Sequence, residues 1–339
     1  MLRILHGTKI DFVKPWRIAV GITIAFIAAG FIMLGVHEAR HGSALAQSIE
    51  FTGGTLMQLE FKQPPDVGQI RATVDAAGFA GSEIQQFGTD REFTVRAAGH
   101  ADEAGGGVEN TAKQIQTALE NKFGTNDMKV VRTEIIGPRV GKELTRNAAL
   151  AILISLGVTL IYLAFRFEWR FGVAAVIATA HDILGTLAFI KYVHLEISLI
   201  VVGGVLTMIG YSLNDTIIIF DRVREDLRKK RKETLYDTVN RAVNETLPRS
   251  VLTHTTTLGA LIGLAVLGGE VIRPFALVML FGVVTGTFSS IYVAPPILLW
   301  IEKRWPRAVG TKGGVGPRNV RSSQQNTPRK DDAPVAAHR

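Results

Sequence analysis

The stretch Ile209-Gly-Tyr-Ser-Leu-Asn-Asp-Thr-Ile-Ile-Ile-Phe220 places an aspartate, Asp215, inside an apolar run that covers residues 197–220. A run of this length can span a bilayer as a helix. A carboxylate at that depth is costly unless it is neutralised, meets a cation or faces water. The stretch therefore predicts a membrane helix and makes proton or ion handling the first hypothesis of function.

The rest of the chain has the same membrane character. It has 339 residues, of which 47% are hydrophobic and 20% charged, with a mean hydropathy of +0.22, values too apolar for an ordinary soluble domain. Six stretches are long and apolar enough to span a bilayer. They cover residues 16–36, 144–165, 171–192, 197–220, 250–267 and 274–300. We therefore predict an α-helical membrane protein with six transmembrane helices.

The first stretch also resembles a secretory signal, because Ser43-Ala-Leu-Ala46 looks like a small-residue cleavage site. Its apolar core is longer than the roughly 7 to 15 residues of a signal peptide. We expect it to be retained as a membrane anchor.

Lysine and arginine predict the orientation. They gather in residues 1–15, between the second and third spans, in the basic loop 221–249 and in the tail 306–339. The positive-inside rule places these segments, and so both termini, in the cytoplasm. The run 224–232 reads as a topology signal beside anionic lipids, and we expect no nucleic-acid binding because no such motif accompanies it. The composition of the tail predicts disorder. 

Residues 38–142 would then form an extracytoplasmic domain. Alternation predicts a strand over 55–61, and Asp66 and Gly78 bracket a helix. Strands near 83–87 and 92–96, a second helix ending at Gly124 and a strand over 129–136 complete a ferredoxin-like βαββαβ pattern of α+β type. The segment lacks the motifs of hydrolases, metalloproteases and phosphate loops, so we expect no enzyme activity, cofactor or metal.

The membrane stretches contain further polar residues. Arg249 opens the fifth predicted span on the same side as Asp215, so we expect the two to pair in the cytoplasmic half of the bundle. Tyr211 and Asn214 lie within one turn of Asp215 on the same predicted helix.

His181-Asp182 falls near the middle of the third predicted span and forms a possible secondary site. The pair could conduct protons or simply bond a neighbouring helix, and the sequence leaves both open. His254, among four threonines, is interpreted as a packed polar group rather than a metal ligand.

Several separate motifs carry a resemblance. They are Glu50-Phe-Thr-Gly-Gly-Thr55, Glu134-Ile-Ile-Gly-Pro-Arg-Val-Gly141, Phe165-Arg-Phe-Glu-Trp-Arg170, Ala180-His-Asp182, Gly210-Tyr-Ser-Leu-Asn-Asp-Thr216 and Asp221-Arg-Val-Arg-Glu225. In this order and spacing, over residues 16–300, the chain resembles the SecF family of bacterial protein-export membrane subunits. That family is part of the SecD/SecF group and is related to the resistance-nodulation-division transporters.

The resemblance implies a function. It implies a multi-pass inner-membrane protein that pairs with SecD and uses the proton-motive force to help draw unfolded preproteins across the membrane. SecYEG, with YajC and YidC, would be further partners. Matching motifs assign the proton path to Asp215 and Arg249, with a further essential aspartate in SecD. They also single out a motif after the first span, made of Glu50, Phe51, Thr52, Gly53 and Gly54.

Two residues depart from the family pattern. Glu50 stands where the family usually has Asp. Its side chain is longer by one methylene, so we expect any tight contact of the family's Asp to be altered here. Pro248 precedes Arg249, so we expect a locally altered start of the fifth helix.

Two other functions fit part of the pattern. Six spans with one inserted domain could be half of a proton-driven small-molecule efflux transporter, although such transporters have larger extracytoplasmic domains. The chain could also be a passive assembly scaffold whose buried charges only fix helix register. Proton flux measured with the partner separates these readings.

Overall fold

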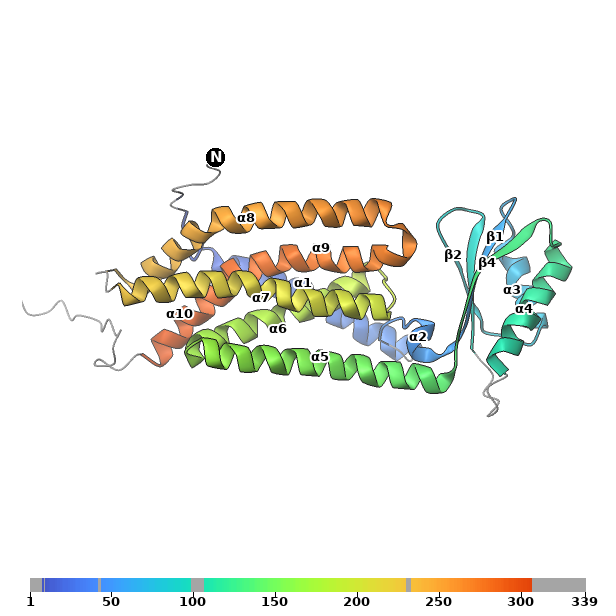
Figure 1. The fold of residues 1–339 in the computed structure, drawn as a ribbon, viewed down its shortest axis with the longest axis horizontal. Coiled ribbons are helices and arrows are strands. Elements are labelled where there is room, and N and C mark those ends of the chain that lie inside the picture. Colours follow the sequence, from blue (N-terminus) through green and yellow to red (C-terminus); the bar gives the residue numbers. More distant parts are fainter. Residues whose placement is uncertain (1–7, 9, 42–43, 99–106, 230–232, 307–339) are drawn as a thin grey trace, which may run out of the picture.

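The computed structural model describes residues 8, 10–41, 44–98, 107–229 and 233–306. Figure 1 shows a long helical bundle with a small sheet domain at one end. The predicted disordered tail lies outside the described residues, apart from Pro306.

The bundle contains seven helices of the described chain. They are α1 (Trp16–His41), α5 (Pro138–Arg166), α6 (Trp169–Tyr192), α7 (Leu199–Arg228), α8 (Leu235–Leu267), α9 (Gly269–Tyr292) and α10 (Ala294–Arg304). Six spans among the described residues are long and apolar enough to cross a membrane, the last formed by α9 and α10 together. The predicted helical membrane fold is therefore confirmed.

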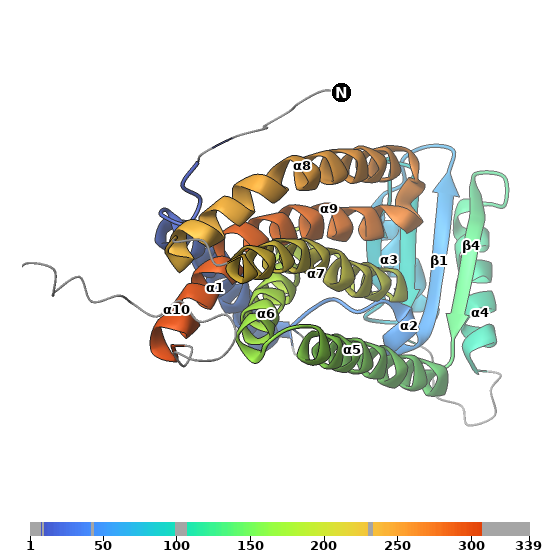
Figure 2. The ribbon, with the colours of Figure 1, turned by 60° about the vertical axis from the view of Figure 1, so that its left-hand side comes forward.

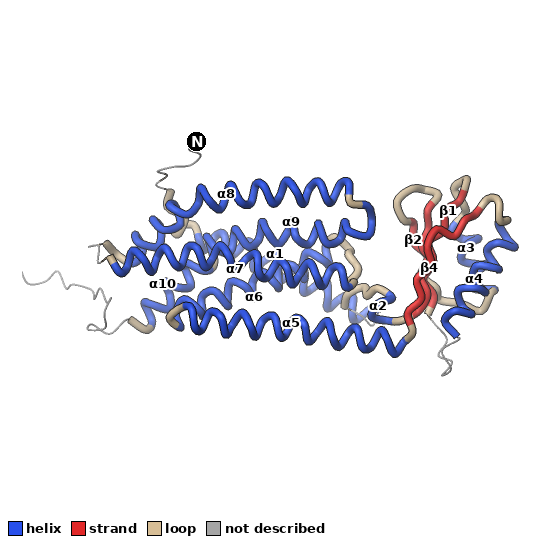
Figure 3. Tube along the Cα trace, viewed as in Figure 1, coloured by secondary structure: helices blue, strands red, loops and turns tan. Residues whose placement is uncertain are grey.

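The small domain is an antiparallel sheet covered on one face. It consists of β1 (Gly54–Phe61), α3 (Val67–Ala76), β2 (Glu83–Gln86), β3 (Glu92–Ala97), α4 (Gly107–Phe123) and β4 (Met128–Ile136). The strand order β2-β3-β1-β4 is that of a ferredoxin-like fold. In Figures 1 and 3, α3 and α4 lie on the face of the sheet turned away from the bundle. Asp66 caps α3 as predicted, accepting a hydrogen bond from Gly68 N at 2.8 Å.

The helices differ in how deeply they are packed. About half or more of the apolar window of α6, α7 and α9 is buried, against 6% in α5, 11% in α1 and 17% in α8. Figure 2 shows α7 and α9 between α8 and α5. The inner helices therefore provide the sheltered positions, and the outer ones present broad apolar surfaces to lipid or to partner helices.

Residues 221–249, predicted as a basic cytoplasmic loop, are mostly helical in the part that the structure describes. Helix α7 continues to Arg228, and α8 begins at Leu235, where the Thr234 hydroxyl accepts a hydrogen bond from Asp237 N at 3.1 Å. Pro248 lies inside α8 and so does not alter its start. An amphipathic first part of α8, with buried Val239 and Val243, packs against the bundle and outweighs the polar composition.

The last predicted span, 274–300, is broken. Helix α9 ends at Tyr292, and α10 starts at Ala294 with Pro295 and Pro296 in its first turn. Proline has no N–H to continue the hydrogen-bond ladder of α9, so the break falls here.

Candidate functional site

Asp215 lies on the inner helix α7 and contacts α8. Its side chain is 6% exposed, and Oδ2 is 3.0 Å from Nε2 of His254. The Ser250 hydroxyl donates to Oδ1 at 3.4 Å. Ser250 and His254 are four residues apart and share one face of α8. The buried carboxylate therefore has a titratable partner on a neighbouring helix.

His254 is also held from α9. Its Nδ1 is 2.9 Å from the Thr287 hydroxyl, and that hydroxyl donates to the Val283 carbonyl at 2.7 Å. The imidazole thus links Asp215 on α7 to Thr287 on α9, although it belongs to α8. Three helices meet at this side chain.

The two other α7 residues predicted beside Asp215 lie in different places. The Tyr211 hydroxyl donates to Thr257 of α8 at 3.0 Å, and its ring centroid is 5.6 Å from that of His254. Asn214 is exposed on the surface of the bundle. The structure brings Tyr211 to the Asp215 site and leaves Asn214 outside it.

Arg249 does not pair with Asp215, contrary to our expectation. The ion pair of Asp215 is with His254, and Arg249 instead lines a polar pocket with residues of α7 and α8. Successive residues of a helix are about 100° apart, so when Ser250 faces Asp215 its neighbour Arg249 lies to one side. The pocket is lined by Ile218, Asp221, Arg222, Glu225, Glu245, Thr246 and Arg249.

A second buried carboxylate, Asp182 on α6, is more completely bonded. It is 0% exposed, and its Oδ2 accepts hydrogen bonds from Ser212 of α7 at 2.5 Å and Ser289 of α9 at 2.6 Å. Its Oδ1 is 3.0 Å from Nδ1 of His181. Nε2 of His181 is 2.9 Å from the Thr23 hydroxyl of α1. The predicted His181-Asp182 pair thus joins four helices.

Close packing of α7 on α9 makes these contacts possible. A Cβ atom at Gly286 would lie 2.8 Å from Ser212 Cβ, and one at Gly282 would lie 2.0 Å from Met208 Cγ. Thr216 and Ser290 are hydrogen bonded across the same interface at 2.8 Å. Glycine at these positions allows the backbones to approach closely.

The motif after the first span links the sheet domain to α7. Residues Ile49–Thr52 form the short helix α2, and Glu50 Oε2 accepts a hydrogen bond from Leu199 N, the first residue of α7, at 2.6 Å. Glutamate therefore reaches this contact with its extra methylene. Its charge lies at the helix end where an anion is favoured. Arg96 of β3 forms an ion pair with Glu196 near the same end.

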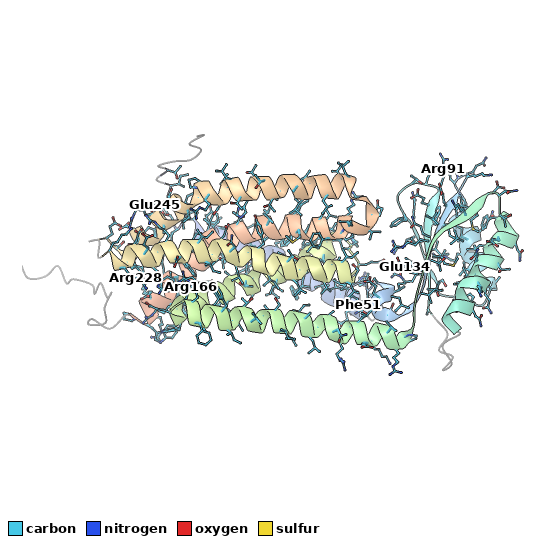
Figure 4. All side chains as sticks on the ribbon, in the orientation of Figure 1. Phe51, Arg91, Glu134, Arg166, Arg228 and Glu245 are labelled. Atoms are coloured by element: carbon cyan, nitrogen blue, oxygen red, sulfur yellow. The ribbon has the colours of Figure 1, made fainter. Side chains whose placement is uncertain are left out.

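The rest of the motif forms the turn into β1. Gly53 and Gly54 have φ angles of 72° and 125°, and a Cβ at Gly54 would lie 2.6 Å from the Ala97 carbonyl. The buried Phe51 precedes this turn, and its carbonyl lies against Gly141 at the start of α5. Thr52 donates to the Ser48 carbonyl at 3.3 Å. Figure 4 shows Phe51 at the junction of bundle and sheet domain.

His254 as the partner of Asp215, and the two serines that bond Asp182, were not predicted from the sequence. His254 was interpreted only as a packed polar group, although its four-residue spacing from Ser250 marks a polar face of α8. Ser212 and Ser289 carried no such signal, since buried serines are common in membrane bundles. Within the described part of the chain, no group of His, Cys, Asp or Glu is arranged to hold a metal ion.

Comparisons with known proteins agree with this architecture. Residues 114–304 match the model of the family described as protein export membrane protein SecD/SecF, C-terminal, and residues 45–65 match the SecD/SecF GG motif. The protein translocase subunit SecF of Gemmatimonas aurantiaca is 59% identical over 310 residues, which cover 91% of each chain. SecF of Vibrio alginolyticus is 40% identical over 300 residues, covering 88% of this chain and 92% of that one.

Two solved structures are similar as well. The crystal structure of SecDF from Thermus thermophilus has a TM-score of 0.75 at 35% identity, covering 88% of this chain and 39% of that chain. SecDF in its super-membrane-facing form gives a TM-score of 0.61 at 35% identity, covering 89% of this chain. The chain therefore spans about two fifths of the SecDF chains and nearly the whole of the SecF subunits. It belongs to the SecF family of protein translocase subunits of the Sec system, multi-pass proteins of the bacterial inner membrane.

Proposed function

We propose that this chain pairs with SecD and couples the proton-motive force to the movement of preproteins across the inner membrane, with Asp215 as a proton-binding residue. The observation that carries the proposal is the contact between Asp215 and His254 across two helices. Either group can take up a proton, and a change in protonation alters the attraction between α7 and α8.

The orientation of the bundle follows from its charged end. Figure 4 shows Arg166, Arg228 and Glu245 at the end remote from the sheet domain. The positive-inside rule assigns this arginine-rich end to the cytoplasm. The sheet domain is then extracytoplasmic, both termini are cytoplasmic, and the pocket lined by Arg249 opens near the cytoplasmic end of the proton path.

Helix α7 provides a route from the proton site to the sheet domain. Asp215 is 16 residues from Leu199, or about 24 Å along the helix. A shift of α7 therefore acts directly on Glu50 and on the Arg96–Glu196 ion pair. One charge crossing 100 mV contributes about 2.3 kcal/mol, enough to bias a modest conformational equilibrium.

The exposed side of α7 is suited to the SecD helices. Thr207, Gly210 and Asn214 are exposed at intervals of three or four residues, and no atom lies within 4 Å of the position of a Cβ at Gly203 or Gly210. Small residues at such spacing let another helix approach closely. We assign preprotein contact to the sheet domain, with SecYEG as the channel and YajC and YidC as further partners.

The test uses the complex with SecD in vesicles under an imposed proton-motive force. Asp215→Asn is expected to abolish the proton-dependent part of preprotein export, because the amide cannot exchange a proton. Arg249→Met is expected to slow it, because the cytoplasmic pocket loses one of its two arginines. Copurification with SecD serves as the assembly control. Unchanged export in Asp215→Asn would contradict the proposal and favour a passive scaffold. Proton flux that responds to small amphiphiles would favour an efflux function.

A further inference from the structure

The hydrogen bonds around His254 define where its protons lie. The Thr287 hydroxyl has one hydrogen, which we assign to the 2.7 Å contact with the Val283 carbonyl, because a carbonyl can only accept. Thr287 Oγ1 is therefore the acceptor in its 2.9 Å contact with His254 Nδ1. It follows that Nδ1 carries a proton.

This assignment limits the contact on the other side of the ring. With Nδ1 protonated, Nε2 either carries a second proton and donates to an ionised Asp215, or is unprotonated and accepts from a neutral Asp215. In both forms one proton lies between Oδ2 and Nε2, 3.0 Å apart, and the pair has no net charge. A neutral pair is the arrangement least costly to bury among apolar helices.

We propose that His254, rather than a permanently charged arginine, shares the transported proton with Asp215. Transfer breaks the O–H bond of the carboxylic acid and forms an N–H bond at Nε2, giving carboxylate and imidazolium without changing the net charge. Loss of the shared proton leaves two lone pairs facing each other at Oδ2 and Nε2. The side chains then repel, which separates α7 from α8. The inference rests on the proposed role of Asp215.

Among the described residues, no other charged group forms an ion pair with Asp215 or His254. Tyr211 of α7 lies beside the imidazole, but its hydroxyl bonds Thr257. From α8, Arg249 lines the polar pocket, and α9 presents the neutral Thr287. Asp182 of α6 is hydrogen bonded to Ser212, one turn before Asp215 on α7, rather than to the pair itself.

The first test is the tautomer of His254, read by nitrogen NMR of histidine-labelled full-length protein in the complex with SecD. The chain has eight histidines, so the signal lost in His254→Gln identifies the residue. The proposal expects a protonated Nδ1 and an Nε2 resonance that shifts in Asp215→Asn. An unprotonated Nδ1 would overturn it, whatever the result of the export assay.

The second test is the pH profile of proton-driven export. His254→Gln should lower the rate about 100-fold or more, within the range lost with a positioned proton-transfer group. Thr287→Val should displace the pH profile, because Nδ1 loses its acceptor, whereas Thr287→Ser should keep it. If Asp215→Asn is inactive and His254→Gln is fully active, the role of His254 is rejected and the proposed function stands. An active Asp215→Asn would reject the proposed function itself.

Discussion

The two buried aspartate–histidine pairs use the same residue types in opposite ways. Asp182 is bonded to an adjacent residue of its own helix and accepts from two serines at 2.5 and 2.6 Å. Asp215 meets its histidine across a helix interface and has one serine at 3.4 Å. A carboxylate that is fully bonded fixes the helices around it. One that depends on a single titratable neighbour leaves its interface open to change.

The largest expected effect on stability is therefore at Asp182. Asp182→Ala leaves buried hydroxyls and an imidazole without their acceptor, and we expect a loss of about 3 kcal/mol or more in unfolding free energy. Thermal unfolding of the purified protein in detergent measures it. Asp221→Ala is the control, since Asp221 on α7 is 51% exposed and paired with Arg166. A loss of similar size in both variants would contradict the stabilising role of the hydrogen bonds of Asp182.

The next largest effect is expected at Gly286, which packs against Ser212 of the Asp182 network. Gly286→Ala should cost about 1 to 3 kcal/mol, because the new methyl group meets Ser212 Cβ and Cα at 2.8 and 2.9 Å. The helices must move apart, which also weakens the bond from Ser212 to Asp182. Gly259→Ala on α8 is the control, since no atom lies within 4 Å there. Equal stability of the two alanine variants would contradict the close α7–α9 packing.

Asp215→Asn is expected to change stability by less than about 1 kcal/mol, because the amide keeps the shape and hydrogen-bonding capacity of the side chain. The same unfolding assay compares it with Asp182→Asn, in which the NH₂ group must lie either against two serine hydroxyls or against His181 Nδ1. We expect the Asp182 variant to lose more. The reverse order would mean that Asp215 is the structural member of the two.

The smallest effect is at the junction with the sheet domain. Glu50→Gln removes the charge at the start of α7 and should cost about 0.3 to 1 kcal/mol. Hydrogen exchange of the first turn of α7 would report it as faster opening. Glu60→Gln, on the exposed side of β1, should leave this turn unchanged. Equal exchange rates in wild type and Glu50→Gln would show that the charge of Glu50 does not stabilise the first turn of α7.

Much of this fold was predictable because its signals are local. Runs of about 20 apolar residues identified the six spans, and alternation with Asp66 and Gly78 identified the order of the sheet domain. The helical structure of residues 221–249 was not predicted, because burial of Val239 and Val243 against the bundle is a tertiary effect that composition does not express. The break between α9 and α10 had a local signal, the two prolines Pro295 and Pro296. It was not predicted because the apolar run 274–300 is long enough for one continuous span.

The site was less predictable than the fold. Asp215, His181 and Asp182 stood out because charged or polar groups in apolar runs are costly. Their partners depend on helix rotation, and a turn of about 100° per residue decides whether Ser250 or Arg249 faces α7. The expected depth of each residue in the bilayer indicated Arg249 as the cation nearest to Asp215. In the structure, helix packing instead brings His254 to Asp215.

Proton flux through the reconstituted complex with SecD tests the difference between the two aspartates most directly. Flux is measured for wild type, Asp215→Asn and Asp182→Asn, each normalised to the amount of folded complex. The account predicts that flux disappears in Asp215→Asn and persists in Asp182→Asn. Flux that persists in Asp215→Asn and disappears in folded Asp182→Asn would contradict it.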